Sequence, residues 1–138
     1  MFFLCKKNTP TDKQILEVIY NKYYDNFSLF SKDNSLRETK IYVPIDLEKI
    51  ANELKVDNDI IFGRLYYHLN KKYGYINENG SKVHFFTPKC GKDKHCVHFP
   101  YLASILANLR EDNNKFRLTL LIAILALIIS IISWFIKN

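Results

Sequence analysis

Glycine is scarce in this sequence, with only four residues among 138. Loops that cradle phosphate groups are rich in glycine, and no P-loop, dinucleotide fingerprint, HExxH motif or nucleophile elbow occurs. Cysteine is also scarce, with three residues. These absences exclude the motif-bearing enzyme classes, and we expect a protein that is not an enzyme.

Charge is missing from residues 118–136, where only Thr119, Ser130 and Ser133 interrupt an apolar run of 19 residues. A helix needs about 20 apolar residues to cross a bilayer core of about 30 Å. A buried core helix that is apolar on every face would need a larger protein around it. The sequence therefore predicts one transmembrane helix over 118–136 with a short tail, 137–138. The run lies at the wrong end for a secretory signal.

Basic residues exceed acidic ones by 20 to 14, for a formal net charge of +6 and a pI of about 9.2. Arg110, Lys115 and Arg117 stand just before the apolar run. Positive residues beside a span favour the cytoplasmic side. We therefore expect a tail anchor in the inner or cytoplasmic membrane, with the soluble domain facing the cytoplasm.

A stalk helix is predicted over residues 100–117, because Pro100 suits the first turn of a helix. It would dock on the soluble domain or pair with a second copy of the chain, so a homo-oligomer is one expected partner. Its apolar residues recur at helical spacing: Leu102, Ile105, Leu106 and Leu109.

The soluble part begins with an extension, residues 1–10, and a capping box at Thr11 and Gln14 that opens a helix. A polar loop over 28–37 and a short strand over 41–43, ended by Pro44, follow. The apolar residues of this first helix are spaced by three and four: Ile15, Leu16, Ile19, Tyr20, Tyr23 and Phe27.

Asp46 is expected to cap a second helix, and Asp57 or Asn58 a third one that Gly74 ends. Asn79-Gly80 then predicts a hairpin between residues 75–78 and 81–86, with Ile76 opposite Val83. The apolar residues of the two helices are Leu47, Ile50, Ala51 and Leu54, then Ile61, Leu65 and Leu69. The expected fold class is α+β.

The segments from Asp46 to Leu54, with Val56, and from Ile61 through Leu65 and Leu69 to Gly74-Tyr75-Ile76 resemble the winged helix-turn-helix superfamily. The resemblance covers residues 11–86 and implies three helices and a β-hairpin wing. Lys55 departs from it, because many members carry glycine there, and the third helix is one residue longer than usual. The fold binds DNA in many members and protein partners in others.

In that family the third helix enters the major groove and the wing touches the backbone or minor groove. Lysines neutralise phosphates, arginine reads guanine and asparagine reads adenine. Residues 57–98 carry a net charge of +3, although Asp57 and Asp59 at the helix start would repel phosphate. The same lysines could instead rest on anionic lipid. The expected contact residues are Arg64, Tyr67, Asn70, Lys71, Lys72 and Lys82.

A basic loop is expected over residues 87–99, and it carries cysteine and histidine. His84, Cys90, Cys96 and His98 supply the four ligands of a structural Zn²⁺ site. The alternatives are free thiols, a disulfide, which the cytoplasmic topology disfavours, or a Cys–His nucleophile activated by nearby basic residues. Cys5, near the N-terminus, is expected to be a free thiol. His68 is expected to be structural.

The sequence thus predicts a membrane-tethered winged-helix protein that binds nucleic acid, as a regulator or a recruiter to the membrane. The alternative is an interaction adaptor or membrane effector whose winged helix holds a protein partner. That alternative is motivated by an aromatic surface of Tyr66, Tyr67, Phe85 and Phe86. Frequent Ile, Asn, Lys and Tyr suggest an AT-rich bacterial or phage genome.

Overall fold

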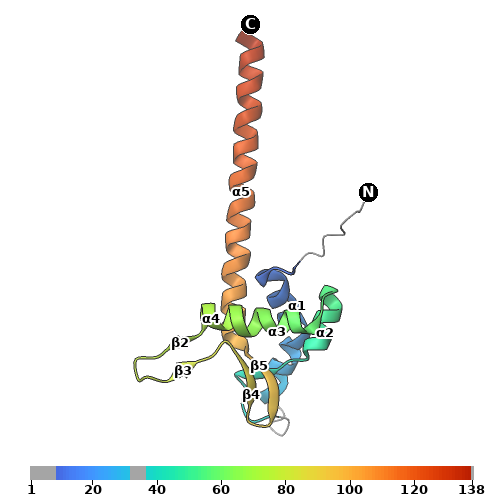
Figure 1. Ribbon diagram of the computed structural model, residues 1–138. Coiled ribbons are helices and arrows are strands. Elements are labelled where there is room, and N and C mark those ends of the chain that lie inside the picture. The colour runs from blue at the N-terminus through green and yellow to red at the C-terminus, as the bar shows by residue number, and fades with distance from the viewer. Residues whose placement is uncertain (1–8, 32–36, 138) are drawn as a thin grey trace. The chain divides into compact units, whose positions relative to one another are not determined.

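A computed structural model of this chain describes residues 9–31 and 37–137. Cys5, most of the extension 1–10 and part of the loop 28–37 lie outside the described residues. The chain divides into two compact units, Met1–Leu106 and Ala107–Asn138. The first mixes helices with small sheets, as the expected α+β class requires, and the second belongs to one long apolar helix (Figure 1).

The first helix, α1 (Asp12–Ser28), begins at the predicted capping box. The Thr11 side chain accepts the backbone N–H of Gln14, and the Gln14 side chain accepts the backbone N–H of Thr11. A short 3₁₀ turn, η1 (Leu29–Ser31), follows α1. The residues of α1 that are buried are Ile15, Leu16, Ile19 and Tyr23.

The second helix, α2 (Leu47–Leu54), is capped by Asp46, whose carboxylate accepts the N–H groups of Glu48 and Lys49. It ends at Lys55, which has φ 56° and lies in the left-handed region. This is the position where the resemblance expects glycine. Glycine adopts that conformation without a steric penalty, so Lys55 carries a local backbone strain that glycine would not.

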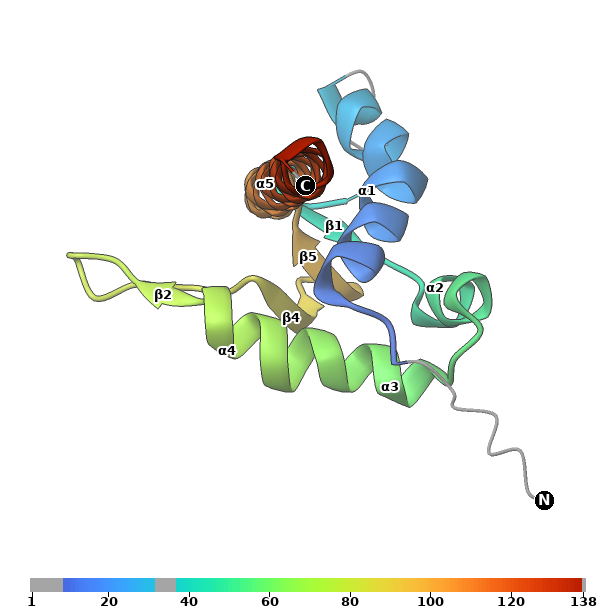
Figure 2. The same cartoon turned by 90° about the horizontal axis from the view of Figure 1, so that it is seen from above.

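The third helical segment consists of α3 (Asn58–Gly63), a π-helical stretch η2 (Arg64–Leu69) and α4 (Asn70–Tyr73), which form one rod in Figure 2. Asp57 caps its start. A spacing of four residues exceeds the 3.6 residues of an α-helical turn, and the wider π turn brings such residues onto one face. The N–H of Asn70 donates to the Leu65 carbonyl in this stretch. The three predicted inward residues are fully buried: Ile61, Leu65 and Leu69.

The strands of the described residues form two antiparallel sheets, both in the first unit. One has the order β1-β5-β4 and the other pairs β2 with β3. Their bounds are β1 (Tyr42–Pro44), β2 (Tyr75–Ile76), β3 (Lys82–Val83), β4 (Phe86–Cys90) and β5 (Asp93–His98).

The β2–β3 hairpin forms where Asn79-Gly80 predicts it, but the predicted pairing of Ile76 with Val83 is wrong by one residue. Val83 lies opposite Tyr75, and the N–H of Asn77 donates to the Ser81 carbonyl, so the turn between these two residues has three residues rather than two. A two-residue type I′ turn needs two left-handed residues in succession. Gly80 has φ 79°, whereas Asn79 does not have a positive φ. The turn therefore takes one residue more than the dipeptide alone suggests.

The predicted basic loop over 87–99 is wrong, because β4 and β5 form a second hairpin there. Cys90 lies opposite Asp93, which leaves Gly91-Lys92 as a two-residue turn. Gly91 has φ 58°, and glycine at the first turn position is the preference of a type II′ hairpin. β5 also pairs with β1, so this hairpin completes the main sheet.

The last helix, α5 (Phe99–Lys137), is continuous over the predicted stalk and span. Its first residues belong to the folded unit, as a docked stalk requires. The rings of Tyr20 and Phe27 stack on Phe99 with centroid distances of 5.6 and 4.9 Å. The buried residues of this helix are Phe99, Leu102, Ile105 and Leu106.

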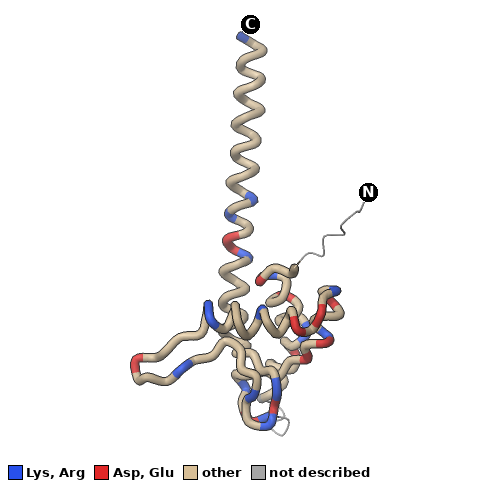
Figure 3. Tube along the Cα trace, in the orientation of Figure 1, with Lys and Arg blue, Asp and Glu red and all other residues tan. Residues whose placement is uncertain are grey.

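The second unit is the remainder of α5. An 18-residue window of this helix has a mean hydropathy of 2.8, with none of it buried. By length and composition the helix can cross a membrane, which is consistent with the predicted span 118–136. Figure 3 shows an uncharged stretch in this unit with charged residues on either side of it.

Candidate nucleic-acid interface

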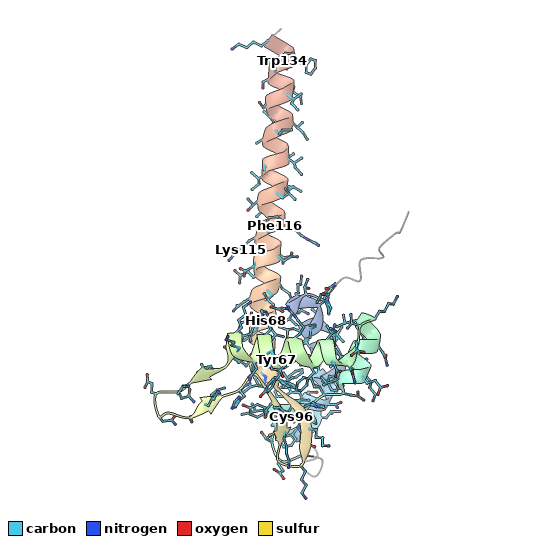
Figure 4. All side chains as sticks on the ribbon, viewed as in Figure 1. Tyr67, His68, Cys96, Lys115, Phe116 and Trp134 are labelled. Carbon is cyan, nitrogen blue, oxygen red and sulfur yellow. The ribbon has the colours of Figure 1, made fainter. Side chains whose placement is uncertain are left out.

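A groove lies between the third helical segment and the β2–β3 hairpin, and we call it the helix–hairpin groove. Its volume is about 450 Å³. Four of the six predicted contact residues line it, and three of these four, Tyr67, Lys71 and Lys82, are exposed. Figure 4 labels Tyr67 on the helix. The full lining is Tyr66, Tyr67, Asn70, Lys71, Gly74, Tyr75, Ile76 and Lys82.

Gly74 lets the backbone turn tightly out of the end of the third helical segment into the hairpin. Its N–H donates to the Asn70 carbonyl at 2.8 Å. A Cβ atom at this position would lie 2.5 Å from that carbonyl oxygen and 3.4 Å from the Val83 carbonyl oxygen. The glycine is therefore required by a backbone approach and not by its φ angle.

Asn70, which we expected to read adenine, is used inside the fold. Its side-chain oxygen accepts the backbone N–H groups of Phe85 and Phe86 at 2.9 and 3.2 Å. Both phenylalanines are fully buried. This one side chain joins the end of the third helical segment to the start of β4, so it positions the hairpins and its acceptor is not available to a base.

Replacing Asn70 by Ala is expected to lower the free energy of unfolding by about 2–6 kcal/mol, because two buried N–H groups lose their acceptor and each costs about 1–3 kcal/mol when unpaired. Urea unfolding of the full chain in mild detergent, followed by the near-UV circular dichroism of its tyrosines, measures the change. Asn70→Asp is the matched control, since it keeps an acceptor oxygen. Equal stability of Asn70→Ala and the parent would contradict this role.

Arg64 and Lys72 also turn to an internal partner, Asp12, in the first turn of α1. Arg64 forms an ion pair with one Asp12 oxygen, and the Lys72 ammonium lies 3.7 Å from the other. His68, which we expected to be structural, is exposed and places Nε2 3.2 Å from that second oxygen. The Asp12 side chain is only 15% exposed. The three residues therefore hold α1 against the third helical segment.

The predicted aromatic surface is only half right. Phe85 and Phe86 are fully buried, whereas Tyr66 and Tyr67 are exposed. Phe86 packs edge-on against Phe62 at a centroid distance of 5.8 Å, in the core between α3 and β4. Phe86 is the first residue of β4, and Phe85 lies at the bend just before this strand.

Three exposed lysines that we did not assign to a site lie on the β4–β5 hairpin: Lys89, Lys92 and Lys94. Figure 3 shows basic positions gathered at the turn of this hairpin, with an acidic one among them. Gly91-Lys92 is the sequence signal that could have placed them on a turn. They form a second basic surface of the first unit, on a different hairpin from Lys82.

The predicted zinc site of His84, Cys90, Cys96 and His98 is not formed. No group of three or more His, Cys, Asp or Glu side chains suited to a metal ion occurs within 9–31 and 37–137. Burial raises the pKa of the Cys96 thiol to about 12, and burial also raises that of Cys90, so neither is activated as a nucleophile. His98 instead accepts the N–H of Tyr101 through Nδ1 at 3.2 Å.

No protein-family model, no curated protein and no solved structure matches this chain. The features from which a function can be inferred are therefore its own: an aromatic groove with two lysines, a second hairpin with three more, and a helix long and apolar enough to cross a membrane.

Proposed function

We propose that this chain is a single-pass membrane protein whose first unit is a winged-helix domain that binds nucleic acid, as a regulator or a recruiter to the membrane. The observation that carries the proposal is the helix–hairpin groove, where exposed Tyr67 and Lys71 on the third helical segment face a hairpin that contributes Lys82.

The winged-helix assignment is supported by element order and strand pairing. α1, β1, α2 and the third helical segment occur in the order that the resemblance implies. Two hairpins follow, and of these β4–β5 joins β1 in a sheet while β2–β3 stays apart. The resemblance placed the wing in the hairpin of residues 75–86, which is β2–β3. Because β4–β5 is the hairpin that pairs with β1, we instead assign β4–β5 as the wing and β2–β3 as an additional hairpin beside the third helical segment.

The charges of the two hairpins support an anionic ligand. Phosphate neutralisation by lysine supplies most of the sequence-independent affinity of nucleic-acid binders. The exposed lysines that serve this role are Lys71, Lys82, Lys89, Lys92 and Lys94. Asp57 accepts the N–H of Asp59 at 2.8 Å, so its carboxylate has a capping role that accounts for its place at the helix start.

Membrane anchoring is compatible with nucleic-acid binding only if the first unit faces the compartment that holds nucleic acid. Arg110, Lys115 and Arg117 precede the apolar run, and such residues favour the cytoplasmic side. Lys115 pairs with Glu111 at 2.7 Å, and this hydrogen bond raises the pKa of Lys115 and keeps it charged. We propose that the first unit lies on the cytoplasmic side of the inner or cytoplasmic membrane.

A protein partner is the second candidate, favoured by the apolar character of the same groove. Tyr67 is 70% exposed and Ile76 is 69% exposed. Aromatic side chains surrounded by a polar rim are typical of protein interfaces. In this alternative the chain is an adaptor that holds a protein at the membrane.

Neutralising the two groove lysines with Lys71→Gln and Lys82→Gln is expected to reduce the salt dependence of nucleic-acid binding. Each lost phosphate contact lowers the slope of log K against log salt by about 1, so the slope should fall by about 2. Fluorescence anisotropy with labelled 30-mers measures this on the full chain in nanodiscs of zwitterionic lipid, which removes anionic lipid as a competitor.

The double variant Lys13→Gln, Lys49→Gln removes the same charge from α1 and α2 and should leave the slope nearly unchanged. Absence of salt-dependent binding to any nucleic acid would discard the proposal. Recovery from cells of a protein partner that survives nuclease treatment would then favour the adaptor.

A further inference from the structure

The helix–hairpin groove has aromatic walls on both sides. Tyr66 and Tyr67 come from the η2 stretch, and Tyr75 comes from β2. Their exposed fractions are 38%, 70% and 49%. The groove therefore offers several ring surfaces to a ligand, with Lys71 and Lys82 beside them.

The rings are held from within the fold while part of each stays exposed. Tyr67 packs edge-on against Tyr66 and Phe62, at centroid distances of 5.0 and 6.4 Å. Tyr75 packs edge-on against Tyr101 at 5.9 Å. A ring that is already ordered loses little conformational entropy when a planar group stacks on it.

The side chains suited to reading a base pair in the major groove are already engaged. Arg64 pairs with Asp12, and the Asn70 oxygen accepts two backbone N–H groups. The third helical segment also begins with acidic residues, Asp57 and Asp59, which repel the phosphates that flank a major groove. What the exposed groove offers is ring surface and ammonium groups, a combination that suits unpaired bases and their phosphates.

We infer that the helix–hairpin groove binds single-stranded nucleic acid in preference to duplex, with unpaired bases stacked on Tyr67 and Tyr75 and phosphates held by Lys71 and Lys82. This inference rests on the proposed nucleic-acid function and names its ligand. Stacking is tolerant of sequence, because every base has a π face. The membrane-anchored chain would therefore hold exposed single strands with little sequence preference.

The test compares a labelled thymidine 30-mer with a duplex 30-mer on the full chain in zwitterionic nanodiscs, by fluorescence anisotropy at fixed salt. The single strand is expected to bind at least tenfold more tightly. Tyr67→Ala should weaken single-strand binding roughly tenfold or more, in line with the loss of one stacked base. Tyr67→Phe should retain it, whereas Tyr67→Leu, which is apolar but not aromatic, should not.

Tyr24→Ala, at another exposed tyrosine on α1, is the matched control and should leave binding unchanged. Equal or tighter duplex binding that is indifferent to Tyr67→Ala overturns this inference and leaves the proposed function standing. Failure to bind either nucleic acid at low salt overturns both. Binding of single strands that Tyr67→Leu preserves as well as Tyr67→Phe does also overturns it, because ring stacking would then play no part.

Discussion

Replacing Leu102 by Ala is expected to lower the free energy of unfolding of the first unit by about 2–5 kcal/mol. Leu102 is fully buried although it lies on the helix that continues into the apolar run. Truncation removes buried methyl groups and leaves a cavity that a packed core fills only in part. Urea unfolding of the full chain in detergent, followed by tyrosine near-UV circular dichroism, measures the loss.

Leu118→Ala is the matched control, because Leu118 lies on the same helix and is 60% exposed. It should leave the transition of the first unit where it is. Equal effects of the two substitutions would show that the start of α5 does not belong to the core. The expected difference implies that a fragment ending at residue 98 would lose four core side chains: Phe99, Leu102, Ile105 and Leu106.

Placing lysines at Leu125 and Ile129 is expected to move the chain from the membrane to the soluble fraction. Each lysine costs about 2.5–3.5 kcal/mol near the centre of a span, whereas each Leu, Ile or Phe contributes about −0.3 to −0.6 kcal/mol. Residues 118–136 contain 13 such apolar residues. Two central lysines therefore cancel most or all of the favourable insertion energy. Extraction of membranes with alkaline carbonate, followed by blotting, measures the distribution.

The control adds the same charge outside the span, at Asn113 and Asn114 in the same helix. It should leave the chain in the membrane and, if the topology is right, reinforce the cytoplasmic orientation. Retention of the Leu125→Lys, Ile129→Lys variant in the membrane pellet would contradict a membrane anchor formed by residues 118–136.

Local signals in the sequence predicted much of the fold. Caps depend on residues two or three positions apart, which is why Thr11 and Asp46 were placed correctly at helix starts and Asp57 was one of two candidates for the third. The inward face of the third helix followed from the spacing of Ile61 and Leu65. The π-helical stretch, which places residues spaced by four on one face, was not predictable, because it depends on packing in the core.

The candidate site was harder to predict from the sequence, because its decisive contacts join distant parts of the chain. Asn70 meets Phe85 across 15 positions, and Arg64 meets Asp12 across 52. Neither partner can be named from helical periodicity, which only says which side of a helix a residue occupies. The exposed residues Tyr67 and Lys71 were predicted because exposure on a helix face does follow from periodicity.

The central position of β5 has a consequence for the order of folding. Its pairing with β4 closes over the two-residue turn Gly91-Lys92, whereas its pairing with β1 joins Tyr42 to His98, 56 positions apart. Loop-closure entropy grows with the logarithm of loop length, which makes the second closure costlier by about 3 kcal/mol. The β4–β5 hairpin should therefore form early, before β1 pairs with β5. Pairing of the three-residue strand β1 with β5 is then the slow step in the folding of a domain whose other contacts are mostly local and form fast.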